Sequence, residues 1–412
     1  MNELRVNGDR FWQSLMVMAK IGATDKGGVC RLALSSEDLK ARNLFSDWCK
    51  ALGMEVRFDA MGNQFARYAG KSANAKPILI GSHLDSQPTG GKYDGVLGVL
   101  AGLEAVRTLH EAGEKPDHPI ELVNWTNEEG ARFAPAMIGS GVYAGAFELE
   151  EAHAITDADG ISIKEALTKN GQLGEGLTRT DYHASLELHI EQGPVLEQNE
   201  KTIGVVTGVQ GMRWYECHVE GKPAHAGTTP MEMRNDPIKR ATALIQRCYE
   251  LVKADPEAKI TIGVLQAYPG SINTVPERVT FNIDLRHPDE AALNMLEENI
   301  SAIIKTWNVI KPGLALEAIW RSPAIHFHPA CIDAIDSACH GLGIASQKLM
   351  SGAGHDSVYI NRMTPTGMIF IPCKDGLSHN EAESIEKEHA VAGANVLLQS
   401  LLQLDQTDDI PL

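Results

Sequence analysis

Short apolar runs alternate with amphipathic segments between about residues 76 and 190, and this alternation constrains the fold more than any other feature. The segments 77–81, 119–125 and 185–190 predict buried strands, and the segment 95–113 predicts a helix. Strands that alternate with helices are typical of an α/β layer. Polar residues follow each of these strands, and ligands of open α/β sheets bind at that edge. We therefore expect the functional site at the carboxyl ends of these strands.

A different order of segments begins near residue 211 and ends near residue 325. Strand, helix, strand, strand, helix and strand follow one another there, with one continuous strand expected over 259–268. This β-α-β-β-α-β order predicts a small α+β domain of the ferredoxin-like kind. The first pattern resumes after it. We therefore predict an α/β domain with a central mixed sheet, residues 1–210 and 326–412, interrupted by an inserted domain, residues 211–325.

The charge and the cysteines restrict the partners and the compartment. The formal net charge is −17 and no long basic run is present, which argues against nucleic acid as a partner. No apolar run approaches the roughly 18 residues of a membrane helix, and the first residues do not resemble a secretory signal. The 7 cysteines are scattered and contain no C-x-x-C pair. We expect a cytoplasmic protein with reduced cysteines and no membrane partner.

Acidic residues and one histidine follow the first two predicted strands. His83 and Asp85 leave the first strand, and Asp94 lies at the start of the next helix. A carboxylate two residues after a histidine can fix the ring tautomer of a metal ligand, and Asp94 can bridge two cations. Glu128 and Glu129 follow the second strand, so one can bind a metal while the other acts as general base. A hydrogen-bonded turn histidine, a helix N-cap and a solvated charge pair are the structural alternatives.

Two further histidines fall at the same predicted edge. His189 lies in the segment 185–190, and His379 lies in the loop after 366–372. A histidine in an apolar alternation is usually a core residue, so neither indicates a site alone. With His83, Asp94 and Glu129 they give two cations a mixed nitrogen and oxygen environment, which suits Zn²⁺ and also Mn²⁺ or Co²⁺. The lack of paired cysteines argues against a structural zinc, so these residues predict a hydrolytic site.

The inserted domain and a late glycine-rich turn carry candidates for substrate binding. Arg286 closes an apolar strand, where a guanidinium can hold a carboxylate by two parallel hydrogen bonds. His225 lies in a turn of small residues, and Asn273 can donate to a carboxylate or a carbonyl. His355 lies among glycines whose backbone N–H groups can meet an anion. A surface cation, a loop histidine and a turn asparagine are the structural alternatives.

Several longer segments occur in a fixed order: GSHLDSQPTGGKYDG, NEEGARF, LHIEQGPVLE, PAHAGTTP, SINTVP, DLRHP, SGAGHDS and IPCKDGLSHN. In these segments, from about residue 20 to 390, the chain resembles the hydantoinase/carbamoylase family. That family comprises N-carbamoyl-L-amino-acid hydrolases, β-ureidopropionases and allantoate amidohydrolases. It lies within the dinuclear aminoacylase and carboxypeptidase-type hydrolases.

The resemblance implies a role for each candidate residue. It implies two divalent metal ions per subunit, with Zn²⁺ expected and Mn²⁺, Co²⁺ or Ni²⁺ as alternatives. The implied metal ligands are His83, Asp94 (bridging), Glu129, His189 and His379. The implied catalytic residues are Glu128 as general base, Asp85 as the partner of His83, and His225 at the oxyanion. The implied substrate contacts are Gln192, His225, Asn273, Arg286, Gly354 and His355, with Asn273 and Arg286 at the substrate carboxylate.

The resemblance also implies the assembly and the reaction. The inserted domain would serve as a lid and form a homodimer, in which His225 reaches the neighbouring subunit's site. The reaction would convert an N-carbamoyl-L-amino acid or N-carbamoyl-β-alanine, both small ureido acids, to amino acid, CO₂ and ammonia. Allantoate amidohydrolase is the main alternative, because allantoate also carries a carboxylate and ureido groups.

Two other functions are less consistent with the residues. Peptidases of the wider group have a carboxylate where this chain has His189, which disfavours a dipeptidase or aminoacylase. An inactive metal-binding dimeric scaffold is an alternative from another class. A scaffold has no need for a base beside a metal ligand, so the pairing of Glu128 with Glu129 argues against it.

Overall fold

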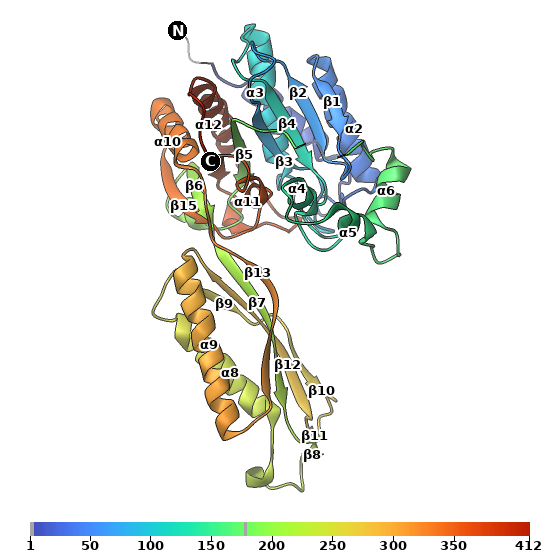
Figure 1. Ribbon diagram of the computed structural model, residues 1–412, viewed down its shortest axis with the longest axis vertical. Helices are drawn as coiled ribbons and strands as arrows, with labels where there is room; N and C mark the ends of the chain where they lie inside the picture. The colour runs from blue at the N-terminus through green and yellow to red at the C-terminus, as the bar shows by residue number, and fades with distance from the viewer. Residues whose placement is uncertain (1–3, 177–178) are drawn as a thin grey trace. The chain divides into compact units, whose positions relative to one another are not determined.

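The computed structural model describes residues 4–176 and 179–412 (Figure 1). The chain divides into two compact units. The first unit consists of Met1–Thr207 and Phe327–Leu412, and the inserted unit consists of Gly208–His326. Among the described residues, no helix combines the length and the apolar character that crossing a membrane requires.

The first unit is built on a mixed sheet, as the sequence predicts. Its strand order is β1-β2-β4-β3-β5-β16-β6, and β15 also pairs with β6, whose last residues, Gly208 and Val209, belong to the inserted unit and pair with β14 of that unit. The bounds are β1 Glu55–Phe58, β2 Gln64–Tyr68, β3 Ile78–His83, β4 Ile120–Trp125, β5 Ala184–Ile190, β6 Ile203–Val209, β14 Ile325–His326, β15 Ser346–Ser351 and β16 Thr366–Ile371. The neighbours β4, β3, β5 and β16 are parallel, whereas β1, β2 and β6 pair antiparallel.

The four parallel strands form the centre of the first unit. Every residue of β3, β4, β5 and β16 is buried, which is why each reads as a nearly continuous apolar run. Helix α3, Val96–Ala112, packs on β3 and β5, and α12, Lys387–Asp405, packs on β5 and β16 (Figure 1). The other helices are α1 Gly8–Met18, α2 Ser36–Ala51, α4 Ile138–Tyr143, α5 Leu149–Ala154, α6 Ile163–Asn170, α7 Val195–Gln198, α10 Pro329–Leu342 and α11 Ser357–Ile360.

The inserted unit is an antiparallel sheet covered by two helices on one face (Figure 1). The strand order is β10-β12-β7-β13, with β9 also paired to β12, and β8 pairs with β11 separately. The bounds are β7 Gly211–Glu220, β8 Ala224–His225, α8 Pro237–Val252, β9 Lys259–Thr261, β10 Leu265–Tyr268, β11 Thr274–Val275, β12 Arg278–His287, α9 Glu290–Ile310 and β13 Leu314–Ser322. Along β12, buried residues alternate with partly exposed ones, and α8 and α9 pack over the buried face.

The expectation of one continuous strand over 259–268 is wrong. The structure has two strands there, β9 and β10, separated by Ile262, Gly263 and Val264. The side-chain oxygen of Asn282 accepts the backbone N–H groups of Gly263 and Val264, at 2.9 and 2.5 Å. A side chain that binds backbone groups competes with the strand ladder, and the strand is interrupted for that reason.

Candidate metal centre

The parallel strands place the predicted ligands at one edge of the first unit's sheet. His83 is the last residue of β3 and pairs in register with Trp125, the last residue of β4. His189 of β5 pairs in register with Phe370 of β16. The carboxyl ends of parallel neighbours lie together, so the loops that leave these strands bring the remaining ligands to the same place.

The five predicted ligands form two groups of donor atoms that share Asp94. One group is His83, Asp94 and His189, the other is Asp94, Glu129 and His379, and the donor atoms of each group lie within 4.8 Å of one another. Oδ1 of Asp94 lies 3.1 Å from Nε2 of His189 and 3.7 Å from Nε2 of His83. Oδ2 of Asp94 lies 3.5 Å from Nε2 of His379, which is 3.3 Å from the Glu129 carboxylate. Asp94 therefore offers one oxygen to each group, as a carboxylate that bridges two cations does.

Backbone carbonyls set the tautomers of the two buried histidines. Nδ1 of His83 lies 3.0 Å from the carbonyl oxygen of Asp85, and Nδ1 of His189 lies 2.9 Å from that of Ile190. A carbonyl oxygen only accepts, so each Nδ1 donates a hydrogen, which leaves Nε2 as the nitrogen that can bind a cation. Imidazole nitrogens with carboxylate oxygens fit a divalent cation such as Zn²⁺ or Mn²⁺ in both groups.

Asp85 contacts His83 in a different way from the one expected. Its carboxylate oxygen lies 3.8 Å from Nδ1 of His83, whereas its backbone carbonyl oxygen lies 3.0 Å from the same nitrogen. The carboxylate instead accepts the backbone N–H groups of Glu128 and Glu129, both at 3.2 Å. Burial, with the nearby Asp38, raises the pKa of Asp85 to about 7. One residue thus orients the ring of His83 and the backbone of both glutamates.

Glu128 lies beside the first ligand group. Its side-chain oxygen is 3.4 Å from Nε2 of His83, and the residue is 8 % exposed. Burial, followed by the charges of Asp356 and Glu129, raises the pKa of Glu128 well above its usual range. The preceding Asn127 has φ 57°, a strained conformation for a residue with a side chain, and its amide donates to the Phe133 carbonyl at 2.7 Å. This hydrogen-bonded backbone at Asn127 directs the Glu128 side chain toward His83 of the first ligand group.

Asp94 and His189 hold each other in their charged forms. Burial would raise the pKa of Asp94, but the hydrogen bond and charge of His189 lower it below its usual range. Burial would lower the pKa of His189, but the hydrogen bond and charge of Asp94 raise it to about 9. A cation that binds Nε2 of His189 must therefore displace a proton.

We expect cation affinity to rise with pH up to about pH 9, because His189 must lose its proton before it binds a metal. Below that pKa, each pH unit should weaken binding at the group of His83, Asp94 and His189 by about tenfold, since the cation displaces the proton of His189. Competition for Zn²⁺ against a chromogenic chelator between about pH 6 and pH 9 measures this dependence. An affinity that stays constant over this range would contradict the protonated His189.

Three polar residues that the sequence did not single out hold the ligand carboxylates. The backbone and side-chain amides of Gln87 donate to Glu129 at 3.2 and 2.7 Å. The Ser378 hydroxyl donates to Asp94 at 2.7 Å, and Glu383 accepts the backbone N–H of Asp94 at 3.2 Å. All three lie within a few residues of a predicted ligand, and that proximity is the only sequence signal that points to them.

The substrate candidates of the first unit have different surroundings. Gln192 donates to Asp94 at 2.9 Å, and within residues 4–176 and 179–412 its buried carbonyl oxygen has no hydrogen-bond partner. His355 is buried, lies 3.0 Å from the Ser351 hydroxyl and packs its ring edge-to-face on His189, with centroids 4.6 Å apart. Gly354 leaves room for Met137, whose methyl carbon would lie 3.0 Å from an added Cβ. Gln192 thus offers an unpartnered carbonyl oxygen, whereas His355 packs against the ring of His189, one of the predicted metal ligands.

The remaining candidates lie in the inserted unit, where the pairing of β8 with β11 brings His225 and Asn273 together. The Ala226 N–H donates to the Asn273 carbonyl at 3.0 Å. Nδ1 of His225 accepts the N–H groups of Gly227 and Thr228 at 3.0 and 3.1 Å, so Nε2 carries the hydrogen. His225 therefore presents an exposed Nε2–H donor.

Arg286 lies on the partly exposed face of β12. Its Nε and Nη2 atoms donate to the Asp284 carboxylate at 3.0 and 2.8 Å. This ion pair orients the planar guanidinium, which is the group that binds a carboxylate with two hydrogen bonds.

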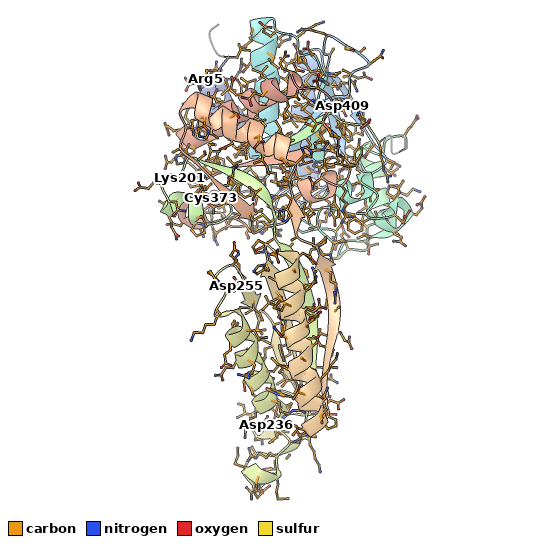
Figure 2. All side chains as sticks on the ribbon, turned by 60° about the vertical axis from the view of Figure 1, so that its left-hand side comes forward. Arg5, Lys201, Asp236, Asp255, Cys373 and Asp409 are labelled. Carbon is orange, nitrogen blue, oxygen red and sulfur yellow. The ribbon has the colours of Figure 1, made fainter. Side chains whose placement is uncertain are left out.

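A further group of possible ligands occurs in the inserted unit, where Asp255 follows α8 (Figure 2). His287 lies 2.9 Å from the Asp255 carboxylate and accepts the Asp289 N–H at 2.8 Å. These hydrogen bonds join the loop after α8 to the end of β12. A structural role accounts for this group.

Comparisons with known proteins identify relatives of this chain. The sequence model of Peptidase family M20/M25/M40 matches residues 79–403. An N-carbamoyl-L-amino-acid amidohydrolase of Rhizobium meliloti is 45 % identical over 406 residues, which cover 97 % of each chain. An allantoate amidohydrolase of Bacillus subtilis (strain 168) is 34 % identical over 94 % of this chain and 95 % of that protein. A crystal structure of a hydantoinase/carbamoylase family amidase from Burkholderia multivorans has TM-score 0.93 and 47 % identity, over 97 % of this chain and 98 % of that chain.

Proposed function

We propose, from the premise that this chain belongs to the hydantoinase/carbamoylase family of amidases within Peptidase family M20/M25/M40, that it is a metal-dependent N-carbamoyl-L-amino-acid hydrolase. The observation that carries this proposal is the pair of ligand groups that share Asp94, with Glu128 beside them. The expected metal is Zn²⁺, with Mn²⁺, Co²⁺ or Ni²⁺ as alternatives, and N-carbamoyl-β-alanine is a second possible substrate.

The proposed reaction adds water across the C–N bond of the ureido group. Two cations, held by the groups that share Asp94, would supply Lewis acidity and a water of lowered pKa. Glu128 accepts a proton from the attacking water and returns it to the nitrogen of the departing amino acid. The Nε2–H of His225 donates to the carbonyl oxygen as negative charge develops there. The carbamic acid that remains breaks down to CO₂ and ammonia.

Substrate recognition rests on the carboxylate and the ureido group. Arg286 and Asn273 are proposed to bind the carboxylate, Arg286 through its oriented guanidinium. Gln192, Gly354 and His355 are proposed to contact the ureido end. The unpartnered carbonyl oxygen of Gln192 supports this, because it can accept a hydrogen bond from a ureido N–H group.

Ammonia release from defined substrates tests this function. The panel holds several N-carbamoyl-L-amino acids with their D forms, N-carbamoyl-β-alanine and allantoate, each assayed after metal removal and after reconstitution. We expect metal-dependent turnover of N-carbamoyl-L-amino acids. Turnover of allantoate alone would favour the allantoate amidohydrolase alternative, to which one relative's name points. Inactivity on every compound would favour the inactive scaffold.

We further propose that residues 211–325 form a ferredoxin-like domain that acts as a lid and joins two subunits. The β10-β12-β7-β13 strand order supports this fold. Exposed Leu265 and Tyr268 on the edge strand β10, with exposed Ile272 after it, support an association surface. The cysteines are free, which supports a reducing, cytoplasmic compartment.

A mixed dimer of two inactive variants should regain activity. We propose that His225 completes the site of the neighbouring subunit, so a His225→Ala subunit paired with a Glu128→Gln subunit contains one intact site. Two different affinity tags allow purification of the mixed dimer, and about half of the wild-type kcat is expected for one of two symmetric sites. A mixed dimer as inactive as both parents would show that His225 acts in its own subunit, and failure to recover any doubly tagged complex would contradict the dimer.

A further inference from the structure

A buried carboxylate of no assigned role lies behind the shared ligand. Glu383 is 2 % exposed, and its Oε1 accepts the backbone N–H groups of Tyr93 at 2.9 Å and of Asp94 at 3.2 Å. Burying a carboxylate is unfavourable unless hydrogen bonds compensate for its lost hydration. Here the compensating donors belong to the backbone that carries Asp94.

The segment 378–383 holds Asp94 at two points. Glu383 binds its backbone nitrogen, and the Ser378 hydroxyl donates to its Oδ2 at 2.7 Å. The same hydroxyl lies 3.2 Å from the Glu383 carboxylate, and because it has one hydrogen, the shorter contact to Asp94 identifies the acceptor. His379, a ligand of the second group, lies in this segment. The segment therefore sets the distance between the shared carboxylate and a ligand almost 300 positions away in the sequence.

Gly91 shows how closely this carboxylate fits the backbone. A Cβ added at Gly91 would overlap the carboxylate of Glu383. The φ of Gly91 is not in the left-handed region, so a side chain there would conflict with the neighbouring carboxylate and not with the backbone conformation. Packing against Glu383 thus explains why residue 91, before Lys92, is a glycine, and the sequence motif alone did not reveal this.

We propose that Glu383 is a positioning residue, which sets the Asp94 carboxylate between the two ligand groups and thereby controls cation binding at both. This proposal rests on the proposed metal centre. It does not depend on the substrate, because the measured quantity is cation binding.

The test compares Glu383→Ala with Glu383→Gln. A glutamine oxygen can still accept both backbone N–H groups, whereas alanine leaves them without a partner. We expect Glu383→Ala to bind cations about 10- to 100-fold more weakly and to change the visible spectrum of the Co²⁺-loaded protein. Glu383→Gln should stay within a few fold of the wild type. Equilibrium dialysis with Zn²⁺ or Co²⁺ measures the affinity and the number of bound cations.

Gly91→Ala provides a second route if Glu383→Ala does not fold. The added methyl group displaces the Glu383 carboxylate, so we expect weaker cation binding here as well. In the double variant, Gly91→Ala should add nothing to Glu383→Ala, because both act through the same carboxylate. Glu104→Ala is the matched control: Glu104 is equally buried but pairs with Arg10, so its loss should lower the Tm and leave cation affinity unchanged.

Three results would overturn the proposal. The first is a Glu383→Ala protein that binds two cations with the wild-type affinity and spectrum, and the second is a Glu383→Gln protein that loses as much affinity as Glu383→Ala. The third is a Glu104→Ala protein whose cation binding weakens to the same extent, which would assign the loss to general destabilisation. A protein that hydrolyses none of the tested ureido acids would contradict the proposed function and leave this cation-binding comparison intact.

Discussion

Glu128→Gln is expected to lower kcat by about 10²- to 10⁴-fold while both cations stay bound, because an amide cannot accept the proton of the attacking water. Glu128 lies 3.4 Å from Nε2 of His83, beside the first ligand group. Glutamine has nearly the same shape and keeps the backbone N–H that donates to Asp85. The variant therefore removes the base and leaves the ligands in place.

Single-turnover kinetics and metal analysis on the same sample test this prediction. Glu129→Gln is the matched control, since Glu129 belongs to the second ligand group and lies next in the chain. That variant should lose cation affinity, which Glu128→Gln should retain. A Glu128→Gln enzyme with near wild-type kcat would show that another group takes the proton.

Gly95→Ala is expected to abolish tight cation binding at the group of His83, Asp94 and His189. Gly95 has φ 68°, and an added Cβ would lie within 2.5 Å of the ring nitrogens of His83. The histidine is buried among fixed neighbours and cannot move away without losing its place beside Asp94. We expect affinity to fall by at least about 100-fold, as for loss of a ligand contact, with kcat falling in parallel.

Gly113→Ala tests whether a positive-φ alanine at an end of this helix weakens cation binding when no atom obstructs its Cβ. Gly113 ends the same helix with nearly the same φ, 69°, but an added Cβ would meet no described heavy atom within 4 Å. At Gly113, with ψ 17° in the left-handed region, an alanine costs about 1 kcal/mol of backbone strain, and at Gly95, with ψ −50°, that strain is larger. Only Gly95→Ala should lose cations in equilibrium dialysis. Equal cation binding by the two variants would contradict the tight packing of residue 95 on His83.

The central strands were predictable because their physical signal is local. The strands β3, β4, β5 and β16 are buried on both faces, so apolar residues dominate each of them, and a short apolar run is visible in any sequence. The partly exposed edge strand β1 carries no such run and escaped prediction. The break between β9 and β10 escaped as well, because it depends on the side chain of Asn282 from a neighbouring strand.

The chain's own order of residues determined which groups are available for chemistry: the histidines and carboxylates that follow apolar strands, and the motifs that resemble one family. Only the tertiary structure decided how those groups act. It divided the ligands into two groups around Asp94, gave Asp85 the glutamate backbone as its partner, and placed Glu383 against the backbone of Asp94. These contacts join residues far apart in the chain, and their geometry follows from how the whole sheet and its loops pack. No local pattern of residues encodes that packing.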